Sequence, residues 1–234
     1  MPDRDKADVP FVRIIDVETT GLDPDDSSIC EIAKIDWQGG VLRAPAADLI
    51  DPESPIPAQA KAIHHITEEQ LIGAPHLRDV IARYGPVEIA AAHNADFDRG
   101  FLEESFAKHW VCTYKASLRV WPDLPSHSNQ FLRYHLGLPD PSETDPEAIL
   151  PHRALHDAIV TGHLFSALTS HLTVREMVAI SREPALMTVL TFGKHRGIKF
   201  AEAPRDYLRW LINNHDDESV KFSAKRALAE KDTS

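Results

Sequence analysis

Cysteine is scarce in this sequence of 234 residues, and long apolar runs and an excess of positive charge are missing. Its two cysteines, Cys30 and Cys112, are too few for a disulfide framework, which predicts a reducing compartment, the cytoplasm. No apolar run approaches the ~18 residues that a membrane-spanning helix needs, so no membrane partner is expected. Residues 1–10 are polar and mixed in charge, without the apolar core of a signal peptide.

The balance of charge is strongly acidic, with 25 Lys and Arg against 36 Asp and Glu and a net charge of −11. Taken alone, that charge argues against nucleic acid as a partner, because proteins that bind phosphates usually carry a basic surface. The acidity is uneven, however. Residues 175–234 hold 11 basic and 9 acidic side chains, whereas residues 1–174 hold 14 and 27, a net charge of −13. The near-neutral C-terminal part is therefore the first place to look for a nucleic-acid contact.

Apolar patterning predicts an α/β domain over residues 11–172, after the polar leader at residues 1–10. Strands are expected at residues 11–15, 29–37, 41–50 and 87–92, the second and third joined by a Gly39-Gly40 turn. A short helix is expected to start at Thr67. Further helices are expected at residues 77–84, 98–109, 114–121, 128–136 and 154–172, with residues 139–151 as a surface loop.

A small hairpin-plus-helix module is expected over residues 173–234. Thr173 and Glu176 have the spacing of a capping box, and residues 187–192 and 198–200 are candidate strands on either side of a turn. Pro204 suits the first turn of a following helix. Lys194 and Arg196 lie between two glycines of the turn, as in a phosphate-contacting loop, so they are candidate DNA contacts. Structural packing of the module explains the same residues equally well, and both interpretations stay open.

The first cluster that indicates chemistry is Asp16 and Glu18, at the end of the first strand. Side chains two residues apart on a strand project from one face, so these carboxylates repel each other unless a cation lies between them. Hard oxygen ligands favour Mg²⁺ or Mn²⁺ over zinc. Surface carboxylates with no ligand at all are a common alternative for such a pair.

Two more acidic positions begin predicted helices. Asp98 follows the strand at residues 87–92, and Asp157 lies in the first turn of the long helix, with His152 just before it. An acidic side chain near a helix N-terminus stabilises the helix dipole without any further function. Taken singly, neither position therefore identifies a site.

Together the three clusters follow a known order. Asp-x-Glu-Thr-Thr-Gly-Leu, His-Asn-x-x-Phe-Asp-x-x-Phe-Leu and His-x-x-x-x-Asp-Ala resemble the three motifs of the proofreading-type 3′→5′ exonuclease superfamily, in its DEDDh branch. The resemblance narrows to the exodeoxyribonuclease X group on residues 110–113, 119–122, 186–197 and 207–211. It implies a ribonuclease H-like fold with a mixed five-stranded sheet flanked by helices.

The resemblance also implies a role for each motif residue. Asp16, Glu18, Asp98 and Asp157 would be the ligands of two divalent cations, Mg²⁺ or Mn²⁺, and His152 would be the general base. His156 and Asp96 do not match the motif positions. Contacts with the substrate would come from Thr19, Thr20, Leu22, His64, Asn94 and Phe97. Core packing is the simpler explanation for Phe97.

The function expected from this resemblance is metal-dependent 3′→5′ hydrolysis of DNA ends, single-stranded and also duplex, to nucleoside 5′-monophosphates in DNA repair. Trimming of RNA 3′ ends is the alternative, because discrimination depends on contacts to the 2′-hydroxyl that no motif reveals. A catalytically inactive DNA-end-binding module is a third possibility. It is disfavoured because a binding module has no need of all five residues Asp16, Glu18, Asp98, His152 and Asp157. Neither the strand preference nor the oligomeric state follows from the sequence.

Overall fold

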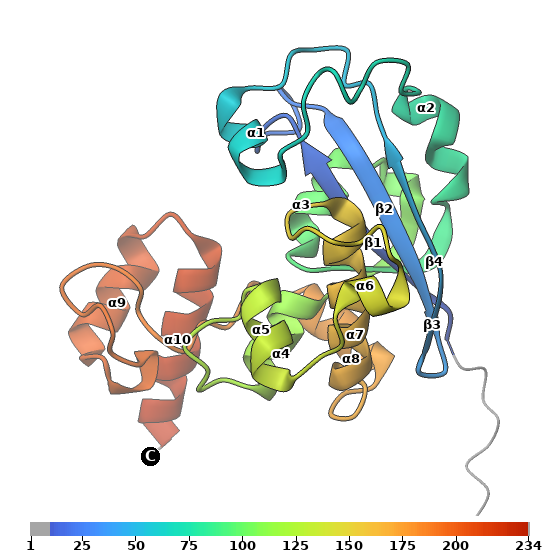
Figure 1. Ribbon diagram of the computed structural model, residues 1–234. Coiled ribbons are helices and arrows are strands. Elements are labelled where there is room, and N and C mark those ends of the chain that lie inside the picture. Colours follow the sequence, from blue (N-terminus) through green and yellow to red (C-terminus); the bar gives the residue numbers. More distant parts are fainter. Residues whose placement is uncertain (1–9, 234) are drawn as a thin grey trace, which may run out of the picture.

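Five strands form one mixed sheet in the computed structural model, which describes residues 10–233 (Figure 1). Apart from its last residue, the expected leader lies outside the described residues. The strands are β1 (Val12–Thr19), β2 (Ile29–Gln38), β3 (Val41–Leu49), β4 (Val87–Ala92) and β5 (Ala107–Cys112). Their spatial order is β3-β2-β1-β4-β5, with β1–β2 and β2–β3 antiparallel and β1–β4 and β4–β5 parallel. The expected ribonuclease H-like sheet is confirmed.

Helices cover both faces of this sheet and continue into the C-terminal part of the chain (Figure 1). Among residues 10–233, no helix is long and apolar enough to cross a bilayer. The α-helices are α1 (Ala58–His64), α2 (Leu77–Val80), α3 (Ala95–Phe101), α4 (Thr113–Val120), α5 (Asn129–Leu136), α6 (Pro141–Thr144), α7 (Ala154–Leu168), α8 (Val174–Ser181), α9 (Arg205–Asn214) and α10 (Glu218–Thr233), and 3₁₀ turns cover Ile81–Arg83, Glu104–Phe106 and Phe200–Glu202.

The central strand β1 is buried on both faces because its successive side chains point to opposite sides. Ile14 lies in the main core with Ile159 and Phe165 of α7. Ile15 lies in the second core with Tyr84 and Phe106 on the other side of the sheet. Apolar contacts on both faces thus hold β1, and with it Asp16 and Glu18, in a fixed position.

The predicted extent of the helix at residues 98–109 is wrong. Helix α3 already ends at Phe101, and residues 107–112 form the edge strand β5, parallel to β4. Leu102 and Phe106 have helical spacing from the preceding residues, but both are buried in the second core. The neighbouring strand supplies the hydrogen-bond partners of β5, and these are not visible in the local sequence.

The helix expected to start at Thr67 is also wrong. The Gln70 side chain does accept a hydrogen bond from the Thr67 backbone N–H (2.9 Å), but the segment continues as turns. Gly73, with φ of +81°, ends it before a helix can propagate. The helix of this region is α1, which lies earlier in the chain.

Within the expected loop at residues 139–151, Asp140 caps the short helix α6 by accepting from Ser142 N–H at 3.0 Å.

The capping box at Thr173 and Glu176 forms as expected and starts α8. Met177 and Val178 of α8 lie in the main core. Helix α8 therefore packs with the sheet, although it follows the boundary expected at residue 173.

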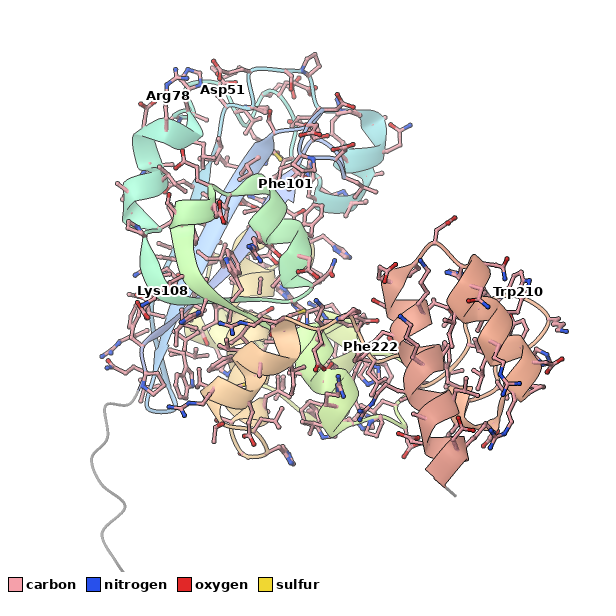
Figure 2. All side chains as sticks on the ribbon, turned by 180° about the vertical axis from the view of Figure 1, so that it is seen from behind. Asp51, Arg78, Phe101, Lys108, Trp210 and Phe222 are labelled. Carbon is pink, nitrogen blue, oxygen red and sulfur yellow. The ribbon has the colours of Figure 1, made fainter. Side chains whose placement is uncertain are left out.

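The C-terminal module has less β-structure and more helix than expected. The predicted hairpin is reduced to a single bridge between Val189 and Lys199, and α10, which was not predicted, packs on α9. Phe222 of α10 lies where the module meets the α/β domain (Figure 2), with the Arg119 guanidinium of α4 5.8 Å from its ring centroid. The module is thus fixed to α4 by its α10 side.

A glycine sets the distance between α7 and the sheet. A Cβ added at Gly162 would lie 2.8 Å from Leu42 Cδ2 and 3.2 Å from Ile35 Cγ2. With any larger residue at position 162, the Leu42 side chain must shift for the helix to stay this close to β2 and β3. Since α7 carries Asp157, this contact also sets where that carboxylate lies relative to β1.

We expect Gly162→Val to lower the free energy of unfolding by about 2 kcal/mol, because overpacking outweighs the small gain in helix propensity. Urea denaturation measures this change. Leu42→Ala, introduced into the same variant, should restore part of the loss, because it removes the atoms that clash. Strictly additive effects of the two substitutions would contradict the close approach.

Candidate active site

Three carboxylates meet at the middle of the sheet. Asp16 and Glu18 project from the same face of β1, and Asp157 approaches them from the first turn of α7. One oxygen from each of the three lies within 4.8 Å of the other two, the arrangement of a metal-binding group. The strand periodicity predicted the first two to share a face, and the fold brings in the third across 139 residues of chain, as the motif order implied.

Asp98 lies beside this group, on α3. Its side chain is 3% exposed and accepts a hydrogen bond from the Val17 backbone N–H at 3.2 Å. Burial raises its pKa to about 7. The strand that carries Asp16 and Glu18 is thus tied directly to the helix that carries Asp98.

The carboxylates oppose one another's ionisation. Burial, followed by repulsion from Asp98 and Asp157, raises the pKa of Asp16 well above its usual range. Burial and repulsion from Asp157 raise the pKa of Glu18 to about 8. Neighbouring carboxylates of this kind ionise fully only when a positive charge is shared between them. Oxygen donors without Cys or His are those of a hard divalent cation, so the residues present fit such an ion.

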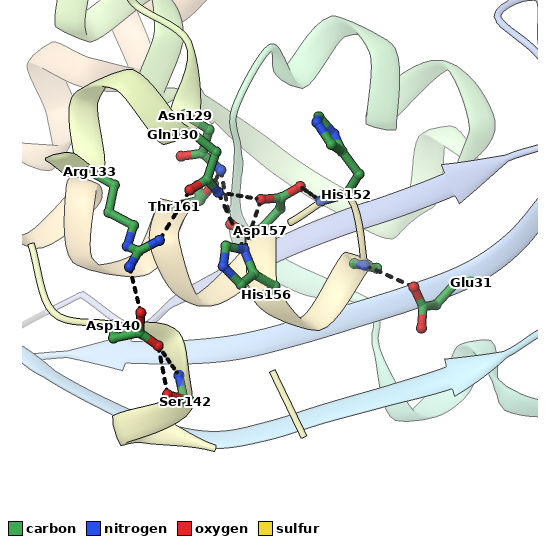
Figure 3. A network of polar contacts seen from close by, with 11 residues as sticks. Glu31, Asn129, Gln130, Arg133, Asp140, Ser142, His152, His156, Asp157 and Thr161 are labelled. Carbon is green, nitrogen blue, oxygen red and sulfur yellow. Dashed lines mark hydrogen bonds and ion pairs between the residues drawn. The ribbon is translucent and has the colours of Figure 1, made fainter. Parts of the chain in front are cut away.

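Asp157 is oriented by three hydrogen-bonding groups (Figure 3). Its oxygens accept from Gln130 Nε2 and from the backbone N–H of His152, both at 3.0 Å. His156 Nδ1 lies 3.1 Å from Asp157 Oδ1, and this ring is buried. The buried His156 ring thus lies directly beside the Asp157 carboxylate. The sequence did not predict this contact, because it does not show which way the His156 side chain points.

His152 is exposed at the end of the loop before α7. Its backbone has a φ of +59°, and its imidazole extends away from the Asp157 carboxylate (Figure 3). The loop that carries it is anchored to the metal-binding group through the His152 backbone N–H. The side chain is consequently free to reorient while its backbone stays next to Asp157.

The sequence interpretation missed Glu31, which belongs to the same site. Glu31 is paired with Glu18 across β1 and β2, is 3% exposed, and accepts from Arg153 Nη2 at 2.6 Å and Nε at 3.0 Å. It also accepts from the Ala154 backbone N–H at 2.8 Å, at the N-terminus of α7. This bidentate pair fixes the start of α7 to the sheet between His152 and Asp157. Lys34 and Asp36 are also charged and buried in β2, so the strand pattern alone did not single out Glu31.

The residues expected to contact substrate divide into exposed and inward-facing groups. Leu22 is 83% exposed and Asn94 is exposed in a left-handed conformation, so both are accessible. Thr19 and Thr20 are buried, and their hydroxyl groups bond to the backbone of the same loop. His64 is only 2% exposed, so its expected contact with the substrate stays a prediction.

The His64 ring is held on both sides. Nδ1 accepts from the Ile66 N–H at 3.0 Å, and Nε2 lies 3.8 Å from Cys30 Sγ. Phe97 is partly buried in the second core against Phe101, with ring centroids 5.0 Å apart, in accord with core packing. Lys194 and Arg196 belong to the C-terminal module.

We expect Glu31→Gln to lower the free energy of unfolding by about 3 kcal/mol, because it leaves the Arg153 charge partly buried without its carboxylate. Chemical denaturation in the presence of a chelator measures this. Replacing both partners, as Glu31→Gln with Arg153→Met, should recover much of the stability. If the double variant is no more stable than Glu31→Gln alone, the two side chains are not coupled.

Comparison with known proteins places this geometry in a family. A family model described as Exonuclease matches residues 14–165. Exodeoxyribonuclease 10 of Escherichia coli K12 is 41% identical over 217 residues, covering 91% of this chain and 95% of that protein. The DNA polymerase III subunit epsilon of Treponema pallidum is 30% identical, over 67% of this chain and 75% of its own length.

Two solved structures share the fold. Exonuclease X in complex with 5′-overhanging duplex DNA matches with a TM-score of 0.66 and 38% identity, over 73% of this chain and 99% of that chain. The nuclease domain of 3′hExo, a DEDDh family member bound to rAMP, matches with a TM-score of 0.56 and 15% identity, over 70% and 94% of the two chains, which shows the fold alone. The three motifs, the sheet and the acidic cluster agree with these matches, and the chain belongs to the exonuclease family.

Proposed function

We propose that this protein is a 3′→5′ exodeoxyribonuclease that releases nucleoside 5′-monophosphates from DNA 3′ ends. The observation that carries this proposal is the convergence of Asp16, Glu18 and Asp157 within 4.8 Å, beside buried Asp98. The relative that shares 41% identity over most of both chains is an exodeoxyribonuclease, which favours DNA over RNA as the substrate. We place this activity in the cytoplasm and in DNA repair.

The four carboxylates would hold two divalent cations, Mg²⁺ or Mn²⁺. When bound, such ions neutralise the phosphoryl oxygens and make water nucleophilic at neutral pH. Asp16 and Glu18 offer oxygens from the sheet, Asp157 from α7 and Asp98 from α3. Gln130 and the His152 N–H hold the Asp157 carboxylate in one orientation, so its oxygen is already aimed at the shared site.

His152 supplies the proton acceptor in this proposal. A neutral imidazole can accept a proton from the attacking water. Its ring is exposed and extends away from the Asp157 carboxylate in Figure 3. In this proposal the side chain turns toward the metal-binding group when a DNA end binds. Leu22 and Asn94, whose side chains are exposed, would contact the terminal nucleotide.

A digestion series tests the proposal. End-labelled single-stranded, blunt and recessed DNA, and an RNA strand of identical sequence, are incubated with Mg²⁺, with Mn²⁺ and with a chelator. We expect metal-dependent release of nucleoside 5′-monophosphates from DNA 3′ ends and much slower release from RNA. Faster release from RNA would replace the assignment with 3′→5′ exoribonuclease.

Asp98→Asn should reduce hydrolysis by more than about 10³-fold, because it removes one negative charge from the metal site while keeping an acceptor for Val17 N–H. Steady-state nucleotide release measures the loss. Asp26→Asn is the matched control and should retain full activity, because Asp26 lies in an exposed turn at residues 23–26. Normal hydrolysis by Asp98→Asn would exclude Asp98 as a ligand.

His152→Gln should lower turnover by about 10²–10⁴-fold, with little effect on DNA-end affinity, because only proton acceptance is lost. Single-turnover digestion and equilibrium binding separate the two quantities. His135→Gln, on α5, serves as the control for removal of an imidazole elsewhere. An unchanged rate in His152→Gln would remove this residue from the mechanism.

A further inference from the structure

The C-terminal module contains a pocket that the exonuclease site does not use. It lies between the turn at residues 192–194 and helix α9, and has a volume of about 560 Å³. Its lining includes Phe192, Lys194, Asp206, Tyr207, Trp210 and His215. This volume is within the usual range for sites that bind small organic groups.

Aromatic rings form the walls of the pocket. Tyr207 and Trp210 stack with centroids 5.8 Å apart and an interplanar angle of 13°. Trp210 is 52% exposed although it is the largest side-chain type, whereas Tyr207 is anchored in the module core. Phe192 and His215 form a second ring pair, with centroids 4.7 Å apart. An exposed, flat ring supported from beneath by another ring is a platform on which a further ring can stack.

The pocket lies in a basic stretch of an acidic chain. Residues 192–215 hold five Lys and Arg and two Asp and Glu, for a net charge of +3, against −11 for the whole chain. Lys194 Nζ lies 5.4 Å from the Tyr207 ring centroid, at the pocket itself. Arg196 and Arg209 are exposed nearby in the chain, while Arg205 and Lys199 are engaged with Asp232 and Asp123. In the pocket lining, Lys194 is therefore the cation that can contact a phosphate, and Asp206 is the carboxylate beside it.

The turn that carries Lys194 is held against α9. Gly193 has a φ of +67°, and a Cβ at this position would lie 2.8 Å from Tyr207 Oη. The turn can approach Tyr207 this closely only with glycine at that position. Beneath it, Leu190, Leu208 and Leu211 form the module core. The rings and the cation are thus held in position by the fold of the module.

The pocket faces away from the α/β domain. In Figure 2, Trp210 projects from the outer side of the module, whereas Phe222 lies on the side that meets that domain. The pocket is consequently separate from the acidic cluster on β1 and α7. A ligand that reaches both must be long.

We propose that this pocket is a second binding site, for single-stranded DNA, in which Trp210 stacks on an unpaired base and Lys194 contacts the adjoining phosphate. Base stacking on aromatic rings beside a basic groove is how proteins hold single strands without reading sequence. Duplex DNA does not suit the pocket, because its bases are already stacked on each other. The carboxylate of Asp206 is compatible with a base, since exocyclic amino groups and the N3–H of thymine can donate to such an acceptor.

The choice of DNA as ligand rests on the proposed exodeoxyribonuclease function, and the binding assay is separate from it. Fluorescence anisotropy is measured on the full chain in a chelator with a labelled oligothymidine of about 30 nucleotides, longer than the roughly 4–16 that one such site covers. Trp210→Ala and Lys194→Gln should each weaken binding at least about 5-fold, the loss expected for one stacked base. Trp210→Phe, which keeps a ring, and Lys225→Gln, which removes an exposed cation of α10, should bind like the unaltered protein. Thermal unfolding checks that every variant is folded.

Length and strandedness provide the second readout. Trp210→Ala should digest a tetranucleotide at the normal rate and a long single strand with a raised KM, because only the long strand spans both sites. Equal binding by all variants, or equal weakening with blunt duplex, would overturn the proposal. So would a change in self-association alone, seen by light scattering, since it would assign the pocket to a second copy of the chain. If every variant digests DNA and binds the oligonucleotide like the unaltered protein, the second site is refuted and the exonuclease function is unaffected.

Discussion

Mutual repulsion among carboxylates at the centre of the sheet is the constraint on which the rest of this structure depends. Asp16, Glu18 and Asp157 converge within 4.8 Å, with Asp98 beside them. Burial raises the pKa values of Asp16, Glu18 and Asp98. A fold that keeps such groups together must hold their backbones rigidly, since the side chains would otherwise move apart. The same repulsion gives the site its affinity for hard divalent cations.

The scaffold meets this requirement through apolar burial and through one buried ion pair. β1 is packed on both faces, so its two carboxylates cannot turn away. On the α7 side, Gly162 permits close contact with β2 and β3, and Glu31 binds both the Arg153 guanidinium and the first N–H of the helix. Glu31 adds another negative charge to an acidic neighbourhood, and Arg153 offsets it. The ion pair therefore joins the helix to the sheet without increasing the net charge of the site.

Sequence patterns predicted those parts of the fold whose signal is local. The alternation in β1 placed Asp16 and Glu18 on one face, and the capping box fixed the start of α8. Strand β5 was not predictable in this way, because its stability comes from pairing with β4 and from burying Ala107 and Val111. Glu31 was missed for a related reason, since its partner Arg153 lies 122 residues away. The family resemblance supplied the long-range convergence of the carboxylates that no local pattern contains.

The net charge of −11 separates into two regions with different physical tasks. The acidic side chains of the α/β domain include the four that would hold cations, and two divalent ions would offset a nominal charge of −4. The rest of that domain still repels the DNA backbone, so its hold on DNA depends on the ions and on contacts at the 3′ end. Residues 192–215, with a net charge of +3 and an exposed Trp210, have the opposite character. An acidic domain that acts on one end of a strand gains most from a second contact farther along it, because the tethered end then rebinds at a raised effective concentration after each cleavage.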